Sequence, residues 1–227
     1  MSHDVRSATD LLRARNRQEE AEALAQPTLA EAFSEGASDG AVTGFVLGRI
    51  GATDRPVLWV QDHLSRREAG RLYLAGFPAE MEVITVEVSR PADALRAMEE
   101  GLGCPALAAV VGEVWGDPAV LDFTATKRLA LRAEAHAVPC WLIRRGGQAN
   151  LSAARERWRV ASLPSLPEPD DIRAPGLAQW QADLFRSRFR PPADYVARPE
   201  GAGVSFDHAT GVRQVGPGLA PLARTAG

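Results

Sequence analysis

The stretch GASDGAV, which contains Gly36 and Gly40, has the glycine content and the setting of a phosphate-binding loop. The signature of such a loop is G-x-x-x-x-G-K-[ST]: glycines let backbone N–H groups close around phosphates, and the lysine reaches the terminal phosphates. Here the two glycines are one residue too close, and Ala41 and Val42 stand where lysine and serine or threonine belong. The only lysine of the chain, Lys127, lies far downstream. We therefore predict a loop that keeps its place in the fold and binds no nucleotide, and we expect no cofactor.

The elements around this loop alternate between apolar strands and helices. Strands are predicted at residues 29–33, 57–60, 82–86, 106–111 and 140–143, and helices at 41–50, 65–75, 91–101 and 118–137. Continuous apolar strands such as ALAAVV, alternating with helices, indicate a parallel sheet that is buried on both faces. The sequence thus predicts an α/β fold with a mostly parallel central sheet and a core containing Leu58, Val60, Val83, Ile84, Ala109, Val110, Leu142 and Ile143.

The two ends of the chain differ from this core, which we place at residues 28–163. Residues 1–27 predict a polar helix whose few apolar contacts, Leu11, Leu12 and Leu24, favour packing on a partner or on another copy. A Pro-rich linker is predicted at 164–179. Residues 180–227 predict antiparallel strands joined by Pro and Gly turns, followed by a loose tail. Trp180 suits either the core or an interface.

Composition excludes several classes of protein. The chain has 227 residues, 45% of them hydrophobic, and a net charge of -3, which gives no global attraction to nucleic acid. Cys104 and Cys140 lie in or beside apolar runs and are expected to be structural thiols rather than a disulfide or a catalytic pair. The N-terminus has no apolar signal core and no run reaches transmembrane length, so we expect a cytoplasmic protein with no membrane contact.

The order of these elements resembles the RecA-type ATPase core and, more closely, the ImuA family of bacterial mutagenesis proteins. The matching stretches are TLAEAFSEGASDGAVTGFVLGRI at the loop, RPVLWVQD, EVITVEVSRPADALRAMEEGL, PALAAVVGEVWGD, VPCWLIRRGG, NLSAARERWRVASLPS, and a W-x-x-x-L-x-R-x-R pattern beginning at Trp180. Together they cover about residues 28–207. The resemblance implies a degenerate RecA-like core.

The resemblance also indicates where two catalytic acids of a hydrolysing relative would lie. The metal-holding acid at the end of the central strand corresponds to Gly112 or, shifted by one residue, to Glu113, and such a shift turns a side chain to the opposite face. The water-orienting glutamate corresponds to Asp62, which is one methylene shorter. Hydrolysis needs these groups together with the lysine, because its catalysis is mostly positioning and charge stabilisation. We therefore interpret Asp62 and Glu113 as acids that merely solvate strand ends, and predict a pseudo-ATPase rather than an enzyme.

Arginines are the candidates for a surface that binds DNA or a partner. In RecA-type recombinases two long loops after the fourth and fifth core strands hold DNA, and the corresponding stretches here are short. The candidate residues are Arg144, Arg145, Arg155, Arg157 and Arg159 around the second stretch, and Arg186 and Arg188 beyond the linker. Such a cluster suits salt-dependent phosphate binding, docking of an acidic protein or a plain solvated face, and the sequence leaves these three open.

The family resemblance implies a non-catalytic adaptor in error-prone translesion DNA synthesis, as part of the SOS response to DNA damage. The partners it implies are an ImuB-type Y-family-like polymerase subunit, a DnaE-type error-prone polymerase and RecA, with weak DNA binding and self-association left open. Two alternatives remain: a nucleotide-dependent RecA-type ATPase with an atypical loop, and a cell-division inhibitor of the SulA type.

Overall fold

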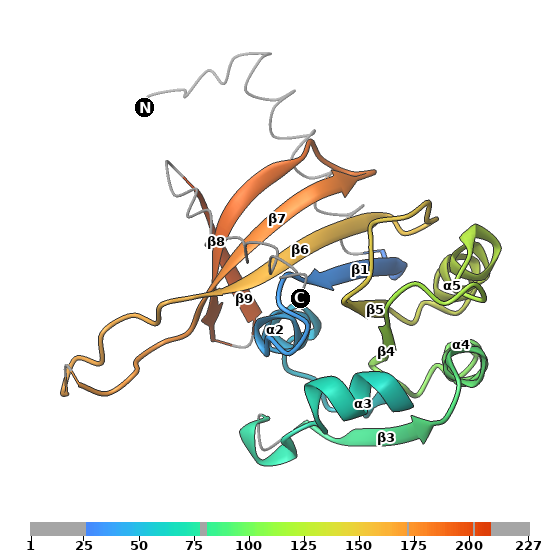
Figure 1. The fold of residues 1–227 in the computed structure, drawn as a ribbon, viewed down its shortest axis with the longest axis horizontal. Helices are drawn as coiled ribbons and strands as arrows, with labels where there is room; N and C mark the ends of the chain where they lie inside the picture. Colours follow the sequence, from blue (N-terminus) through green and yellow to red (C-terminus); the bar gives the residue numbers. More distant parts are fainter. Residues whose placement is uncertain (1–25, 78–80, 172, 202, 210–227) are drawn as a thin grey trace, which may run out of the picture.

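A computed structural model describes residues 26–77, 81–171, 173–201 and 203–209 of the chain. Within these residues the strands form a nine-stranded sheet in the order β3-β2-β4-β5-β1-β6-β7-β8-β9 (Figure 1). The strands are β1 (Leu29–Ser34), β2 (Val57–Asp62), β3 (Val83–Val88), β4 (Ala109–Trp115), β5 (Cys140–Arg145), β6 (Glu156–Leu163), β7 (Gln179–Ser187), β8 (Ala193–Glu200) and β9 (Gly203–His208). Pairs from β3 to β6 are parallel and pairs from β6 to β9 are antiparallel, which confirms the predicted α/β class.

The described helices are α2 (Ala41–Ile50), α3 (His63–Ala69), α4 (Pro91–Gly101) and α5 (Phe123–His136), with a 3-10 turn at Leu74–Gly76. The predicted bounds of α2 and α4 are confirmed. α3 begins earlier than predicted, at His63, and also ends earlier, at Ala69; Gly70 follows with a φ of 86°, which favours glycine. α5 begins later than predicted, after Asp122, whose carboxylate accepts a hydrogen bond from the Ala125 amide at 2.7 Å. The helix predicted at the N-terminus, with Leu11, Leu12 and Leu24, lies outside the described residues.

Two hydrophobic cores lie on opposite faces of the parallel half of the sheet. The side chains of β5 show the division, because Trp141 and Ile143 pack in the core that contains α2, whereas Cys140 and Leu142 pack in the core that contains α4 and α5. Burial of both faces explains why these strands are continuous apolar runs rather than alternating ones.

Most of the predicted core residues are buried: Leu58, Val60, Ala109, Val110, Leu142 and Ile143. The prediction is wrong for the strand β3, where Ile84 is 43% exposed and Val83 is only partly buried. The reason is the position of β3 at the end of the sheet, where it has a neighbouring strand on one side only. β4 lies near the centre of the parallel half, as predicted, although it begins at Ala109 rather than Ala106.

Strands β7, β8 and β9 continue the same sheet beyond β6. The Pro-rich residues 164–178 connect β6 to its antiparallel neighbour β7, and Pro167 pairs with Pro175 within this connection. Trp180 is 7% exposed and packs in the core beneath α2, so it is a core residue. α2 can approach it because Gly44 has no side chain: a Cβ there would meet the Trp180 ring at 2.8 Å.

No helix in the described ranges combines the length and the apolar character needed to cross a membrane.

Candidate functional site

The loop between β1 and α2 occupies the position of a phosphate-binding loop, at the carboxyl end of a central parallel strand. Neither Gly36 nor Gly40 has a positive φ, and a Cβ on Gly40 would meet no atom within 4 Å. Ala41 and Val42, in the positions of the missing lysine and hydroxyl residue, are buried in the core as the first turn of α2. The loop therefore lies where a phosphate site would lie, but its backbone conformation does not require glycine at either position.

The side chain of Arg145, at the end of β5, fills this loop from the inside. Its Nη1 donates to the carbonyl oxygens of Asp39 at 2.9 Å and Ala37 at 3.5 Å. Its Nη2 donates to Thr43 Oγ1 at 2.8 Å, and its Nε donates to Glu113 Oε2 at 2.8 Å. The arginine is only 4% exposed. The loop thus turns carbonyl oxygens towards a cation of the chain itself, whereas a phosphate-binding loop turns N–H groups towards an anion.

A carboxylate of the chain also occupies the N-terminus of α2. The Ala41 amide donates to Asp39 Oδ1 at 2.9 Å, and the amide of Ser162 donates to Asp39 Oδ2 at 2.8 Å. Burial alone would raise the pKa of Asp39, but hydrogen bonds from Ser162 and Ala41, together with the charge of Arg145, outweigh it and hold that pKa below its ordinary value. The partial positive charge of the helix end, which attracts anions, is therefore already compensated by Asp39.

Replacing Asp39 with asparagine is expected to remove a contribution to stability that depends on pH. Because the pKa of Asp39 is lower in the folded protein than its ordinary value of 3.8, its carboxylate stabilises the fold above that pH and loses this effect as the pH falls below it. Urea denaturation between pH 7 and pH 2 should show D39N to be less stable than the wild type at pH 7, with the difference shrinking towards pH 2. E68Q, at an exposed site, is the control; a D39N difference that is the same at every pH would contradict the assignment.

Glu113 faces the loop, and the prediction that it solvates a strand end is wrong. It is 1% exposed and accepts hydrogen bonds from Trp59 Nε1 at 2.8 Å and from Arg145. Its neighbour Gly112 faces the other side of the sheet, against Met98 of α4. The one-residue shift therefore does place an acid beside the loop, but both of its oxygens are already engaged.

Gly112→Ala tests this arrangement of faces. An alanine Cβ would clash with Sδ of the buried Met98, so the variant is expected to lose about 1–3 kcal/mol of stability through overpacking. Gly36→Ala is the matched control in the loop, where the Cβ would make only an ordinary 3.5 Å contact with Asp39 and the change should stay within about 0.5 kcal/mol. Thermal denaturation of the two variants measures the difference, and equal effects would contradict the structure.

Asp62 is a helix cap rather than a solvated acid, so this prediction is also wrong. Its carboxylate accepts hydrogen bonds from the Ser65 amide at 2.7 Å, at the start of α3, and from the Trp115 amide at 3.1 Å. It is 1% exposed. Asp62 therefore links the start of α3 to the end of β4 through these two amides. Because both carboxylate oxygens accept a hydrogen bond and the side chain is buried, Asp62 is poorly placed to orient a water molecule.

Arg144 and Arg157, predicted as part of a binding surface, are instead buried on the α5 side of the sheet. Arg157 Nε donates to Glu31 Oε2 at 2.6 Å, and Arg144 lies 4.0 Å from the other oxygen of the same carboxylate. Arg144 also donates to Asp117 at 2.5 Å, and Ser152 donates to Glu31 at 2.8 Å. The physical reason is the strand order, which puts β1 between β5 and β6 so that Glu31 has an arginine on each side. With Arg145, these residues form internal ion pairs and not a surface.

The sequence prediction missed Glu31. The residue lies within the apolar run LAEAF and is completely buried. A lone acid in an apolar strand was the available signal, because a buried carboxylate needs a charged or hydrogen-bonding partner.

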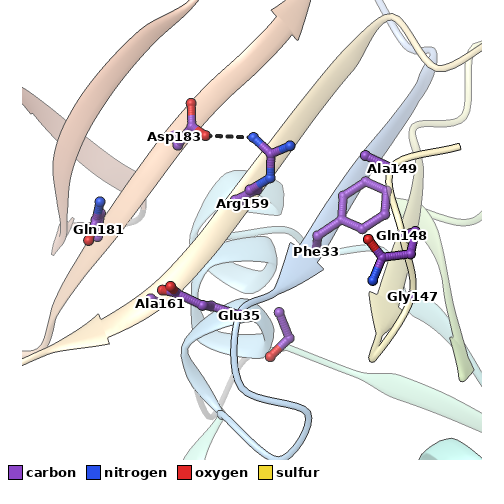
Figure 2. A pocket seen from close by; sticks show the side chains of 10 residues that line it. Phe33, Glu35, Gly147, Gln148, Ala149, Arg159, Ala161, Gln181 and Asp183 are labelled. Atoms are coloured by element: carbon purple, nitrogen blue, oxygen red, sulfur yellow. Dashed lines mark hydrogen bonds and ion pairs between the residues drawn. The ribbon is translucent and has the colours of Figure 1, made fainter. Parts of the chain in front are cut away.

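The other predicted arginines remain near the surface. Arg155, Arg186 and Arg188 line one hollow beside α5. Arg159 lies in a different place, on β6, and borders a cavity of about 370 Å³ beyond the end of β1 (Figure 2). There it pairs with Asp183 at 2.9 Å and lies 4.1 Å from the centre of the Phe185 ring. The charge of Arg159 is therefore already compensated by Asp183, and this cavity has no free cation among the residues that line it.

The two thiols differ in exposure. Cys140 is fully buried, which raises the pKa of its thiol far above the ordinary value. Cys104 is exposed in the turn after α4, so the expectation of apolar surroundings is wrong for this residue. Both are free cysteines, and the described ranges contain no group of three or more His, Cys, Asp or Glu side chains that could hold a metal ion.

Sequence comparison gives the relatives of this chain. It is similar to two proteins named Protein ImuA, from Caulobacter vibrioides strains NA1000 / CB15N and ATCC 19089 / CIP 103742 / CB 15, each 35% identical over 167 residues. The alignment covers 67% of this chain and 65% of each relative, so it spans just under two thirds of their length. No protein-family model matches the chain. On the strength of this identity, the chain belongs to the ImuA family.

Proposed function

We propose that the chain is a non-catalytic adaptor of a DNA damage-induced mutagenesis system, built on a RecA-like core that no longer handles nucleotides. The observation that carries the proposal is the side chain of Arg145, which occupies the loop between β1 and α2. Membership of the ImuA family supports the mutagenesis setting. The strand order, with the loop at the end of a central strand, supports a RecA-like core.

Arg145 engages the groups that would hold a metal ion in a nucleotide site. In phosphate-loop enzymes Mg²⁺ is held by a loop serine or threonine and by an acid on a neighbouring strand. Here Val42 stands in the hydroxyl position, and the adjacent hydroxyl, Thr43 Oγ1, and the acid on β4, Glu113 Oε2, both accept hydrogen bonds from Arg145 at 2.8 Å. A magnesium ion would have to displace a buried guanidinium, and the loop has no lysine to attract the phosphates.

Titration calorimetry with ATP and Mg²⁺ tests the loss of nucleotide chemistry. No binding is expected below millimolar nucleotide. The loop lacks the lysine that would bind the phosphates, and Asp39 already compensates the partial positive charge at the N-terminus of α2. Micromolar affinity, or ATP hydrolysis that is lost in D62N, would instead establish a nucleotide-dependent enzyme.

The adaptor role predicts direct binding to an ImuB-type polymerase subunit, a DnaE-type polymerase or RecA. Each purified partner would be immobilised in turn and the full chain passed over it, with biolayer interferometry as the readout. Binding to at least one partner is expected, and binding to none would contradict the proposal. Binding to the cell-division protein that SulA-type inhibitors target, in place of these partners, would favour the SulA-like alternative.

Surface substitutions are the suitable variants for mapping such contacts. Removing the strands after residue 176 would expose the core, since Trp180 and Tyr195 pack beneath α2 and are 7% and 8% exposed. Loss of binding in that truncation would therefore report unfolding rather than a lost contact.

A further inference from the structure

A hollow of about 390 Å³ lies between α5, the segment that enters β6 and the end of β7. We call it the basic hollow. Its lining includes four basic side chains and two large apolar ones: Lys127, Arg155, Arg186, Arg188, Phe123 and Leu131.

The charge of the basic hollow is largely uncompensated. No acidic residue lines it, although the chain as a whole has a net charge of -3. Arg155 pairs with Glu134 at 2.8 Å. Lys127 and Arg186 make no ion pair with any residue of the described ranges, whereas the charge of Arg188 also acts on Glu134 and helps to lower the pKa of that carboxyl. All three side chains are exposed. Four basic side chains against the single carboxylate of Glu134 therefore leave the depression with an excess of positive charge, which favours an anionic ligand.

The same depression exposes apolar surface. Phe123, Lys127 and Leu131 follow one another at intervals of four residues, so α5 presents them on one face. Phe123 is 42% exposed and Leu131 is 51% exposed. A ligand that covered these two side chains would gain hydrophobic burial in addition to its ion pairs.

We propose that the basic hollow docks a protein segment in which a bulky apolar side chain is flanked by carboxylates. The apolar side chain would lie against Phe123 and Leu131, and the carboxylates would pair with Lys127, Arg186 and Arg188. Aromatic and arginine side chains are common anchors of protein interfaces, and charge complementarity sets the orientation of the partner. The inference rests on the proposed adaptor function, to which it assigns a binding surface.

Single-stranded DNA would be attracted by the same cations, but the apolar lining favours protein. Proteins hold single strands by stacking successive bases on aromatic side chains along a basic groove. The lining of the basic hollow contains one aromatic residue, Phe123, and its other large apolar side chain, Leu131, offers no stacking surface.

Nuclear magnetic resonance of the ¹⁵N-labelled full chain provides the direct test. The probe is a synthetic twelve-residue peptide with a central Leu-Phe pair flanked by Asp and Glu. Chemical-shift changes are expected at residues 123–131, 152–155 and 186–188, and a peptide with Ala-Ala in place of Leu-Phe should bind about tenfold more weakly. No change at these residues up to millimolar peptide, or equal affinity for the two peptides, would overturn the proposal.

Charge reversal separates a built site from general attraction. The combined variant K127E/R186E/R188E is expected to bind the acidic peptide at least about tenfold more weakly than the wild type. The control R67E/R96E/R173E makes the same change in net charge at exposed arginines elsewhere, and its affinity should stay within about twofold at physiological salt. Equal losses in the two variants would overturn the proposal.

Leu131→Ser keeps the test informative if the charge-reversed variant fails to fold, because Leu131 is half exposed and belongs to neither core. This variant should bind the acidic peptide about threefold more weakly, or worse, and unchanged affinity would overturn the apolar part of the proposal.

The oligonucleotide dT12 is the counter-probe. If it changes the same resonances and binds more tightly than the peptide, the basic hollow is a nucleic-acid site and the protein-segment assignment fails.

The adaptor function is judged separately with whole partner proteins. If K127E/R186E/R188E binds a polymerase partner as well as the wild type does, the hollow has no docking role and the adaptor function stands. If the wild type binds no partner, the adaptor function fails whatever the peptide does.

Discussion

Replacing Arg145 with methionine is expected to lower the free energy of unfolding by about 3–5 kcal/mol, the cost of leaving the partner of a buried ion pair uncompensated. Glu113 would lose its ion pair at 1% exposure and be left with only the Trp59 indole as a donor. The carbonyl oxygens of Ala37 and Asp39 would also lose the guanidinium to which they now accept hydrogen bonds. Urea denaturation at pH 7 measures the loss.

A double-mutant cycle identifies the cause. R145M/E113Q should be more stable than R145M alone, because the amide removes the unpaired charge. Arg128→Met is the matched control: this arginine is 56% exposed and pairs with Glu99 on the surface, so its loss should cost about 0–1 kcal/mol. If R145M loses no more than R128M, the filled loop does not hold the fold together and the account of the site is wrong.

Replacing Glu31 with glutamine is expected to have an effect of similar size, about 3–5 kcal/mol, because two buried guanidinium groups depend on one carboxylate. Arg157 is 3% exposed and lies 2.6 Å from Glu31, and Arg144 is equally buried. Asp117 still pairs with Arg144 in the variant, so Arg157 bears most of the loss. Chemical denaturation, monitored by circular dichroism, gives the change in stability.

Two further variants show whether charge or hydrogen bonding is responsible. Ser152→Ala removes two neutral hydrogen bonds and no charge, because the hydroxyl donates to Glu31 and accepts from the Ala154 amide; it should cost about 1–3 kcal/mol. Combining Glu31→Gln with Arg157→Met should restore part of the stability, since it removes both members of the pair. An E31Q protein that is no less stable than S152A would show that the two arginines reach other partners or solvent.

The parts of the fold that local signals determine could be predicted from the sequence. Helix α4 begins at Pro91, where a fixed φ suits the first turn, and its predicted bounds are confirmed. The alternation of apolar strands with helices gave the parallel sheet, since only a sheet covered on both faces has such strands. The place of the loop followed from the same pattern.

The interior charges could not be predicted in this way. Arg145 lies 32 residues from Glu113, and Arg157 lies 126 residues from Glu31. A cluster of arginines next to one another in the sequence suggests a solvated face, because arginine is rarely fully buried unless it is paired. Whether it is paired depends on which strands flank one another, and the strand order is not a local property. The prediction that Ile84 is buried was wrong for the same reason, since nothing within VITVEV shows that β3 lies at the edge of the sheet.

The position of β1 between β5 and β6 has a consequence for the order of synthesis. β1 precedes the other described strands, yet its neighbours, Cys140–Arg145 and Glu156–Leu163, follow more than one hundred residues later. At ribosomal rates of about 5–20 residues per second, both edges of β1 remain unpaired for on the order of ten seconds. During that time Glu31 is without its arginines, and an open apolar strand is a template for wrong pairing. A nascent chain interrupted before residue 163 leaves this strand incomplete on one side or both.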